Sequence, residues 1–204
     1  MSKPIIYFLI LSLSIIFIYL IRSYVIIFAS LLVIFDRCIL GRVKIIHGIE
    51  FTTISILLVA IKYDLITSIL FCIFILYILP AGINFFLGDR WITNKEFKLV
   101  RSVFGLIINI FSVLIVILLK NLDLILIMFV VLLFGHTAYL LKGKLTQSNY
   151  IIDYFGILIN FLFNLSIIYF FHPFWLSLLT WDIIFKTKQN LQFFVQSFAY
   201  FFIF

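Results

Sequence analysis

The chain has 204 residues, of which 66% are hydrophobic and only 11% are charged. Ordinary soluble domains contain roughly 45–50% apolar and 25% charged residues, so this composition excludes a soluble globular fold. The net charge of +7 comes from basic residues in short segments between apolar runs, where membrane topology explains them better than nucleic-acid binding. The sequence predicts an integral membrane protein whose partner is the lipid bilayer, with no nucleic-acid partner.

The apolar runs are long, and the whole chain holds only 8 glycines and 3 prolines, which favours helices over the turn-rich pattern of a membrane barrel. The predicted fold is therefore all-α, a polytopic bundle of six transmembrane helices in a single domain, 1–204. Within it, 1–47 forms an N-terminal span with a basic loop, and 172–204 forms an interfacial C-terminal tail. The predicted spans are 5–35, 48–61, 65–87, 99–119, 122–141 and 151–171.

Two of these runs carry an irregularity. Arg22 interrupts the first, and if 24–40 crosses separately there are seven spans, although Arg22 and Ser23 offer no good turn residue. In the third run, Pro80 and Gly82 predict a kink with exposed carbonyls before Asn84. The connections at 62–64 and 120–123 are short, so we expect antiparallel hairpins there.

The distribution of Lys and Arg predicts the orientation in the cell membrane. The loops after spans one, three and five hold more basic residues than the opposite side, so we expect these loops to be cytoplasmic. Six spans then place both termini outside, and seven place the N-terminus inside. The richer side holds Arg37, Arg42, Lys44, Arg90, Lys95, Lys98, Arg101, Lys142 and Lys144, and the poorer side holds Lys3, Lys62, Lys120, Lys186 and Lys188.

After the last span, Trp175 and Trp181 stand close to Lys186 and Lys188. Tryptophan and lysine together are typical of the membrane interface, so they predict an anchor. The segment 191–204 is too short to cross a bilayer, and we expect it to lie on the surface or to be half inserted.

Polar residues inside the apolar runs indicate where helices face one another or a cavity, because lipid offers polar groups no partner. Several such residues recur at intervals of three and four, which places them on one face of a helix. The stripes are Asp153, Gly156, Asn160 and Asn164; Arg101, Gly105, Asn109 and Ser112; and His47 and Glu50 followed by Thr52 and Thr53, with His136 and Tyr139 near the end of the fifth run.

Each stripe admits two interpretations. Asparagines commonly join transmembrane helices by hydrogen bonds, and a glutamate such as Glu50 complements the positive N-terminal end of a helix. The clustering of polar residues on several helices also predicts a small polar pocket at the membrane boundary. The predicted ligand-binding residues are Glu50, Asn109, Asn160 and Asn164, with His47 and Asp153 as contacts at the rim.

Familiar catalytic patterns do not occur in the sequence: there is no GxSxG, HExxH or GxxxxGK[ST]. No metal site or cofactor is therefore predicted, and an enzyme is disfavoured.

The stretch "GIEFTT" (48–53) follows a basic "GRVKIIH", and "INFLFNLSIIYFFHPFWLSLL" (159–179) comes late in the chain. Both resemble archaeal membrane proteins grouped with the substrate-binding S components of energy-coupling-factor transporters. The layout also resembles that of the rod-shape-determining six-helix membrane proteins. The first resemblance implies a compact six-helix bundle that binds a small-molecule ligand and assembles with transporter ATPase and transmembrane partner subunits.

Three functions remain open from the sequence. The first is a non-enzymatic, small-ligand-binding subunit of a transporter-like assembly. The second is a membrane scaffold whose polar stripes bind only its own helices or a partner protein. The third is an intramembrane enzyme that acts on lipid or isoprenoid.

Overall fold

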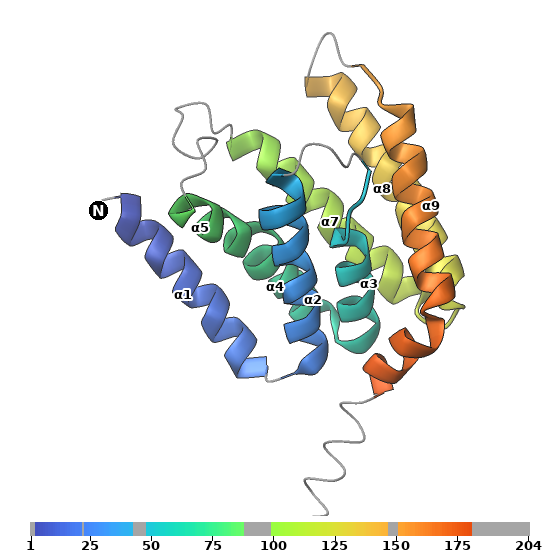
Figure 1. Ribbon diagram of the computed structural model, residues 1–204, viewed down its shortest axis with the longest axis horizontal. Helices are drawn as coiled ribbons and strands as arrows, with labels where there is room; N and C mark the ends of the chain where they lie inside the picture. The colour runs from blue at the N-terminus through green and yellow to red at the C-terminus, as the bar shows by residue number, and fades with distance from the viewer. Residues whose placement is uncertain (1–2, 22, 43–47, 88–98, 147–150, 181–204) are drawn as a thin grey trace, which may run out of the picture.

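The computed structural model describes residues 3–21, 23–42, 48–87, 99–146 and 151–180, and every regular element within them is helical (Figure 1). The prediction of an all-α fold is confirmed for this part of the chain. The elements are α1 (Lys3–Ile21), α2 (Tyr24–Ile34), the π-helix η1 (Phe35–Ile39), the 3₁₀-helix η2 (Leu40–Arg42), α3 (Thr52–Lys62), α4 (Leu65–Phe71), the π-helix η3 (Cys72–Ile78), α5 (Leu79–Phe86), α7 (Leu99–Leu119), α8 (Leu124–Thr146) and α9 (Tyr154–Phe170).

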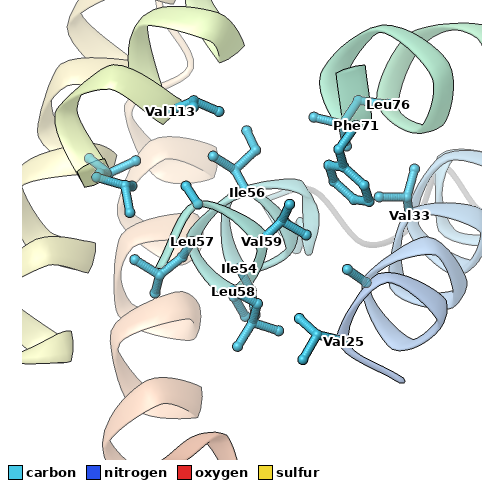
Figure 2. Close-up of a cluster of buried hydrophobic side chains, with 14 of the residues drawn as sticks. Val25, Val33, Ile54, Ile56, Leu57, Leu58, Val59, Phe71, Leu76 and Val113 are labelled. Carbon is cyan, nitrogen blue, oxygen red and sulfur yellow. The ribbon is translucent and has the colours of Figure 1, made fainter. Parts of the chain in front are cut away.

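Helix α3 is the centre of the bundle. Residues 54–60 are buried without interruption, and Ile54, Leu57 and Leu58 are completely buried. Such a helix must be enclosed by other elements, and α3 packs against α2, α4, α7 and α8. Figure 2 shows its side chains pointing in several directions, towards Val25 and Val33 of α2 and Val113 of α7 among others.

Within the described part of the chain, two helices are long and apolar enough to cross a membrane, 65–86 and 124–145. A third is present if Tyr154–Phe170 and His172–Thr180, which meet at a bend of 68°, form one broken span. The sequence predicted six. The difference arises partly because α3 has only 11 residues, about 16 Å of helix against a hydrocarbon core of roughly 30 Å.

The first apolar run is divided into two helices. Ser23 precedes α2 as its N-cap, and its hydroxyl accepts a hydrogen bond from the backbone N–H of Val25 at 3.2 Å. Figure 1 shows α1 and α2 running in opposite directions from this point. A serine cap thus supplies the break for which the sequence offered no glycine or proline.

Pro80 is accommodated by a change of helical pitch. Residues Cys72–Ile78 form the π-helix η3, and the N–H of Leu79 donates to the carbonyl of Phe74. The hydroxyl of Ser14, on α1, donates to the same carbonyl at 3.0 Å. The kink predicted at Pro80 therefore appears as a π-helical segment one turn earlier, and the carbonyl of Phe74 in this segment also accepts a hydrogen bond from the neighbouring helix α1.

The segment after α9 folds back onto the bundle. Trp175 is buried, its Nε1–H donates to the carbonyl of Ile167 at 3.1 Å, and its ring lies 6.1 Å from that of Phe28. The ammonium of Lys62 donates to the carbonyl of Leu179. The Trp175 ring thus packs against the bundle, and the interfacial position of 172–204 stays a prediction. Trp181, Lys186, Lys188 and 191–204 lie outside the described residues.

Candidate functional site

The N-terminal end of α3 is held by a carboxylate from another element. Its first turn follows a non-helical segment, 48–51, and the free N–H groups of that turn need acceptors. Oδ2 of Asp36, on η1, accepts from the N–H groups of Phe51 and Thr52 at 3.1 and 3.0 Å, and from the Thr52 hydroxyl at 2.7 Å. One oxygen thus caps the central helix from 16 residues away in the sequence.

A network of charges surrounds this cap. Asp36 is 6% exposed, and its burial raises the pKa of the carboxyl, as does the nearby Glu50, although Arg37 and the capping hydrogen bonds oppose the shift. Nη2 of Arg37 pairs with Oε1 of Glu50 at 3.2 Å, and Nε of Arg37 donates to the Thr52 hydroxyl at 3.2 Å. The side chains of Asp36, Thr52, Arg37 and Glu50 therefore form one connected group.

The raised pKa of Asp36 has a consequence for stability. The folded state holds the proton of this carboxyl more tightly than the unfolded chain does, so the stabilisation that arises from the shifted pKa is complete below the ordinary pKa and is lost as pH rises through the raised one. We expect the stability of the natural protein relative to Asp36→Asn to fall as pH rises across that window. Unfolding of both proteins in detergent at a series of acidic pH values measures the difference, and a constant difference would contradict the expectation.

The second carboxylate oxygen of Glu50, Oε2, contacts the polar stripe of α9 that contains Asn160 and Asn164, which we call the asparagine stripe. Nδ2 of Asn160 lies 3.5 Å from Oε2 of Glu50, and Oδ1 of Asn160 lies 3.2 Å from Nε2 of His136. Because the amide oxygen can only accept, Nε2 of His136 carries the proton in this contact. Nδ2 of Asn164 donates to the backbone and side-chain oxygens of Asn160 at 2.9 and 3.1 Å. The polar chain therefore passes from α3 to α9 and α8.

Two adjoining cavities lie beside this network. The smaller has a volume of about 40 Å³, which holds a few water molecules. The larger has a volume of about 240 Å³ and is more open. Residues common to both are Asn109 and Tyr139, and the Tyr139 hydroxyl donates to Oδ1 of Asn109 at 3.4 Å.

The linings differ in character. The smaller cavity is lined by Glu50, Thr52, Thr53, Ile56, Asn109, Ser112, Val131, Leu132, Gly135, His136, Tyr139 and Asn160. The larger cavity, which we call the basic groove, is lined by Arg37, Leu76, Tyr77, Gly105, Leu106, Asn109, Tyr139 and Lys142.

The predicted site residues are partly brought together. Glu50, Asn109 and Asn160 line the smaller cavity, and Asn164 is buried one turn beyond Asn160. Asp153 instead caps α9, where its Oδ1 accepts from the N–H of Gly156 at 2.8 Å, and it lines neither cavity. His47 lies outside the described residues.

The structure adds polar residues that the sequence did not single out as site residues: Asp36, Arg37, His136, Tyr139 and Lys142. Arg37 and Lys142 were predicted only as cytoplasmic charges. A signal for the first pair existed, since Asp36 and Arg37 are adjacent opposite charges at the end of a long apolar run, where a charge without a partner is costly.

Within the described ranges, no group of three or more His, Cys, Asp and Glu side chains is placed to hold a metal ion. The arrangement offers polar and charged groups for binding a ligand. The chain matches no protein-family model, no curated protein and no solved structure, so the geometry of the site is the basis for its interpretation.

Proposed function

We propose that the protein is a multi-pass helical membrane protein that binds a small polar ligand between α3, α7 and α8. The observation that carries the proposal is the pair of adjoining cavities, whose linings contain a carboxylate, two basic side chains and several amide and hydroxyl groups. Binding sites for small molecules combine an enclosed space with a few convergent polar groups. Helices long enough to cross a membrane contribute to these linings, since 65–86 supplies Leu76 and Tyr77 to the larger cavity and α8 lines both cavities.

The size of the cavities limits the ligand. Sites for drug-sized molecules usually measure about 300–1,000 Å³, whereas the basic groove measures about 240 Å³. The contact between the two residues shared by both linings is long for a hydroxyl donor, 3.4 Å between Tyr139 and Asn109. A ligand that displaces the Tyr139 hydroxyl would reach both spaces. We therefore infer a metabolite or headgroup of a few heavy atoms in width.

We further propose that the protein works as a subunit of a transporter-like assembly with ATPase and transmembrane partners, in line with the resemblance to S components. The proposed topology has six spans, with the loops after spans one, three and five in the cytoplasm. One observation supports the sidedness: Arg37 and Lys142, both assigned to the cytoplasmic side, line the same groove. In this topology the groove lies at the cytoplasmic end of the bundle.

A membrane scaffold is the second candidate. It is favoured by the asparagine contacts, because Asn160 bonds to His136 on α8, and Asn109 bonds to Tyr139 on the same helix. Contacts of this kind join transmembrane helices without any ligand. An intramembrane enzyme has less support, since both described carboxylates of the network are engaged, Asp36 by the α3 cap and Glu50 by Arg37.

Exchanging Glu50 for glutamine is expected to reduce ligand binding at least about tenfold while leaving the fold intact. Glu50 is 34% exposed in its pair with Arg37, and pairs of this kind stabilise proteins by only about 0–1 kcal/mol. The loss of a charged contact to a ligand is larger, about 1.5–3 kcal/mol. Native mass spectrometry of gently extracted protein measures the amount of co-purified small molecule, and thermal unfolding measures the stability.

Asp153→Asn is the matched control, because it alters a carboxylate that lines neither cavity and keeps an oxygen for the α9 cap. A co-purified ATPase pair or metabolite would support the transporter-subunit proposal. A bare chain carrying only bulk lipid, or equal ligand occupancy in the natural protein and Glu50→Gln, would favour the scaffold instead.

A further inference from the structure

We propose that the basic groove binds an oxyanion, the phosphate or carboxylate group of the ligand. This inference rests on the proposed ligand-binding function and specifies the chemical class of the ligand. The described linings of the two cavities differ in sign: the smaller contains Glu50 as its one charged residue, whereas the described lining of the groove contains Arg37 and Lys142 and no carboxylate. An acidic group is thus attracted to the groove and repelled from the smaller cavity.

The geometry brings several donors to one place. A methyl group built on Gly105 would lie 3.7 Å from Nζ of Lys142 and 3.8 Å from the Tyr139 hydroxyl, so both groups converge above this glycine. The Lys142 ammonium also lies 5.4 Å from the centroid of the Tyr139 ring, a distance at which cation and ring attract each other. The ring therefore helps to hold the ammonium at the wall of the groove.

Arg37 contributes from a different element. Its Nε and Nη2 contact Thr52 and Glu50 at 3.2 Å each, and these contacts fix the guanidinium plane beside the groove. Its side chain is 42% exposed, and the guanidinium carries five N–H donors in all. Charged donors from η1 and α8, together with the Asn109 amide that also lines the groove, match the several acceptor oxygens of a phosphate or carboxylate.

Such an oxyanion has two sources, a soluble molecule or the headgroup of an anionic lipid. The first arm of the test titrates inorganic phosphate onto the full-length protein in nanodiscs of phosphatidylcholine and follows the midpoint of thermal unfolding. The second arm compares nanodiscs of phosphatidylcholine alone with nanodiscs that also contain phosphatidic acid. Stabilisation by phosphate in the first arm indicates a soluble source, and stabilisation in the second arm alone indicates a lipid headgroup.

Two substitutions test the groove itself. Lys142→Gln removes one charge, and Gly105→Leu fills the space while keeping both charges. Each is expected to weaken the apparent affinity at least about tenfold, the usual effect of losing a charge-assisted contact. Lys144→Gln is the matched control, because Lys144 is an exposed lysine two residues further along α8 that does not line the groove, and its affinity is expected to equal that of the natural protein.

Stabilisation by phosphate or by phosphatidic acid supports the inference if it is lost in Lys142→Gln and Gly105→Leu and kept in Lys144→Gln. The absence of stabilisation in both arms, or equal affinity in Lys142→Gln and the natural protein, overturns it. The proposed function fails separately. A co-purified ligand that is lost in Glu50→Gln but has no acidic group would support the proposed function and contradict the oxyanion site. Phosphate binding without any co-purified ligand would support the oxyanion site and count against the proposed function.

Discussion

Replacing Gly48 with alanine is expected to destabilise the folded protein by roughly 3 kcal/mol, from about 1–2 kcal/mol of backbone strain and about 1–3 kcal/mol of steric overlap. Gly48 has a φ of 91°, a conformation that other residues rarely adopt. A Cβ atom there would lie 2.6 Å from the carbonyl oxygen of Gly156 and 2.9 Å from Cβ of Ile159. Since backbone of α9 forms one side of this contact, α9 or the segment before α3 must move.

The loss is measured by denaturant or heat unfolding of both proteins in the same detergent. Gly135→Ala provides the matched control, because a Cβ at this helical position meets nothing within 4 Å among the described atoms. Alanine there is expected to be neutral or to stabilise α8 by up to about 1 kcal/mol through its higher helix propensity. Equal unfolding midpoints for Gly48→Ala and Gly135→Ala would show that the segment does not pack on α9 in this way.

Removing the carboxyl of Asp36 is also expected to destabilise the folded protein strongly, by about 3 kcal/mol for Asp36→Ala. The part-buried N–H of Phe51 and the buried N–H of Thr52 lose their acceptor, and the Thr52 hydroxyl loses its partner as well. A buried donor without an acceptor costs about 1–3 kcal/mol. Asp36→Asn keeps an oxygen for these donors and is expected to lose much less.

Asp64→Ala is the control for this comparison. Asp64 is exposed at the start of α4, where the hydroxyl of Thr67 donates to its Oδ1 at 2.5 Å. Water can replace that contact, so a small effect is expected. Unfolding titrations of Asp36→Ala, Asp36→Asn and Asp64→Ala rank the three losses. A loss for Asp36→Ala as small as that for Asp64→Ala would mean that α3 does not depend on its distant cap.

Composition and periodicity predicted much of the fold. The fourth run was predicted as 99–119, and α7 has these bounds, Leu99–Leu119. The asparagine stripe also lies on the buried face of α9, since Gly156, Asn160 and Asn164 are all buried. Both successes follow from lipid as a solvent, because any helix face that carries amides must turn towards protein.

Contacts between distant residues were not predictable in the same way. The cap of α3 joins Asp36 to Thr52, and the pairing depends on where η1 places its carboxylate after two helices have folded. Asp153 shows the opposite difficulty: it continues the periodic stripe of α9, yet it lies before the first turn and caps it. Periodicity identifies a helix face, but the position of the helix N-terminus decides whether the first residue of the stripe faces the bundle.

The short central helix also constrains how the chain is made. With 11 residues, α3 is shorter than the hydrocarbon core of a bilayer is thick, and the acceptor for its first turn comes from η1. Helices α7 and α8, which enclose it, follow later in the sequence and therefore leave the ribosome after it. We therefore expect α3 to stay at the membrane surface or beside α2 during synthesis until these later helices are made. Assembly of the bundle therefore completes after translation has passed α8, and interruption before that point would leave the centre of the protein open to lipid.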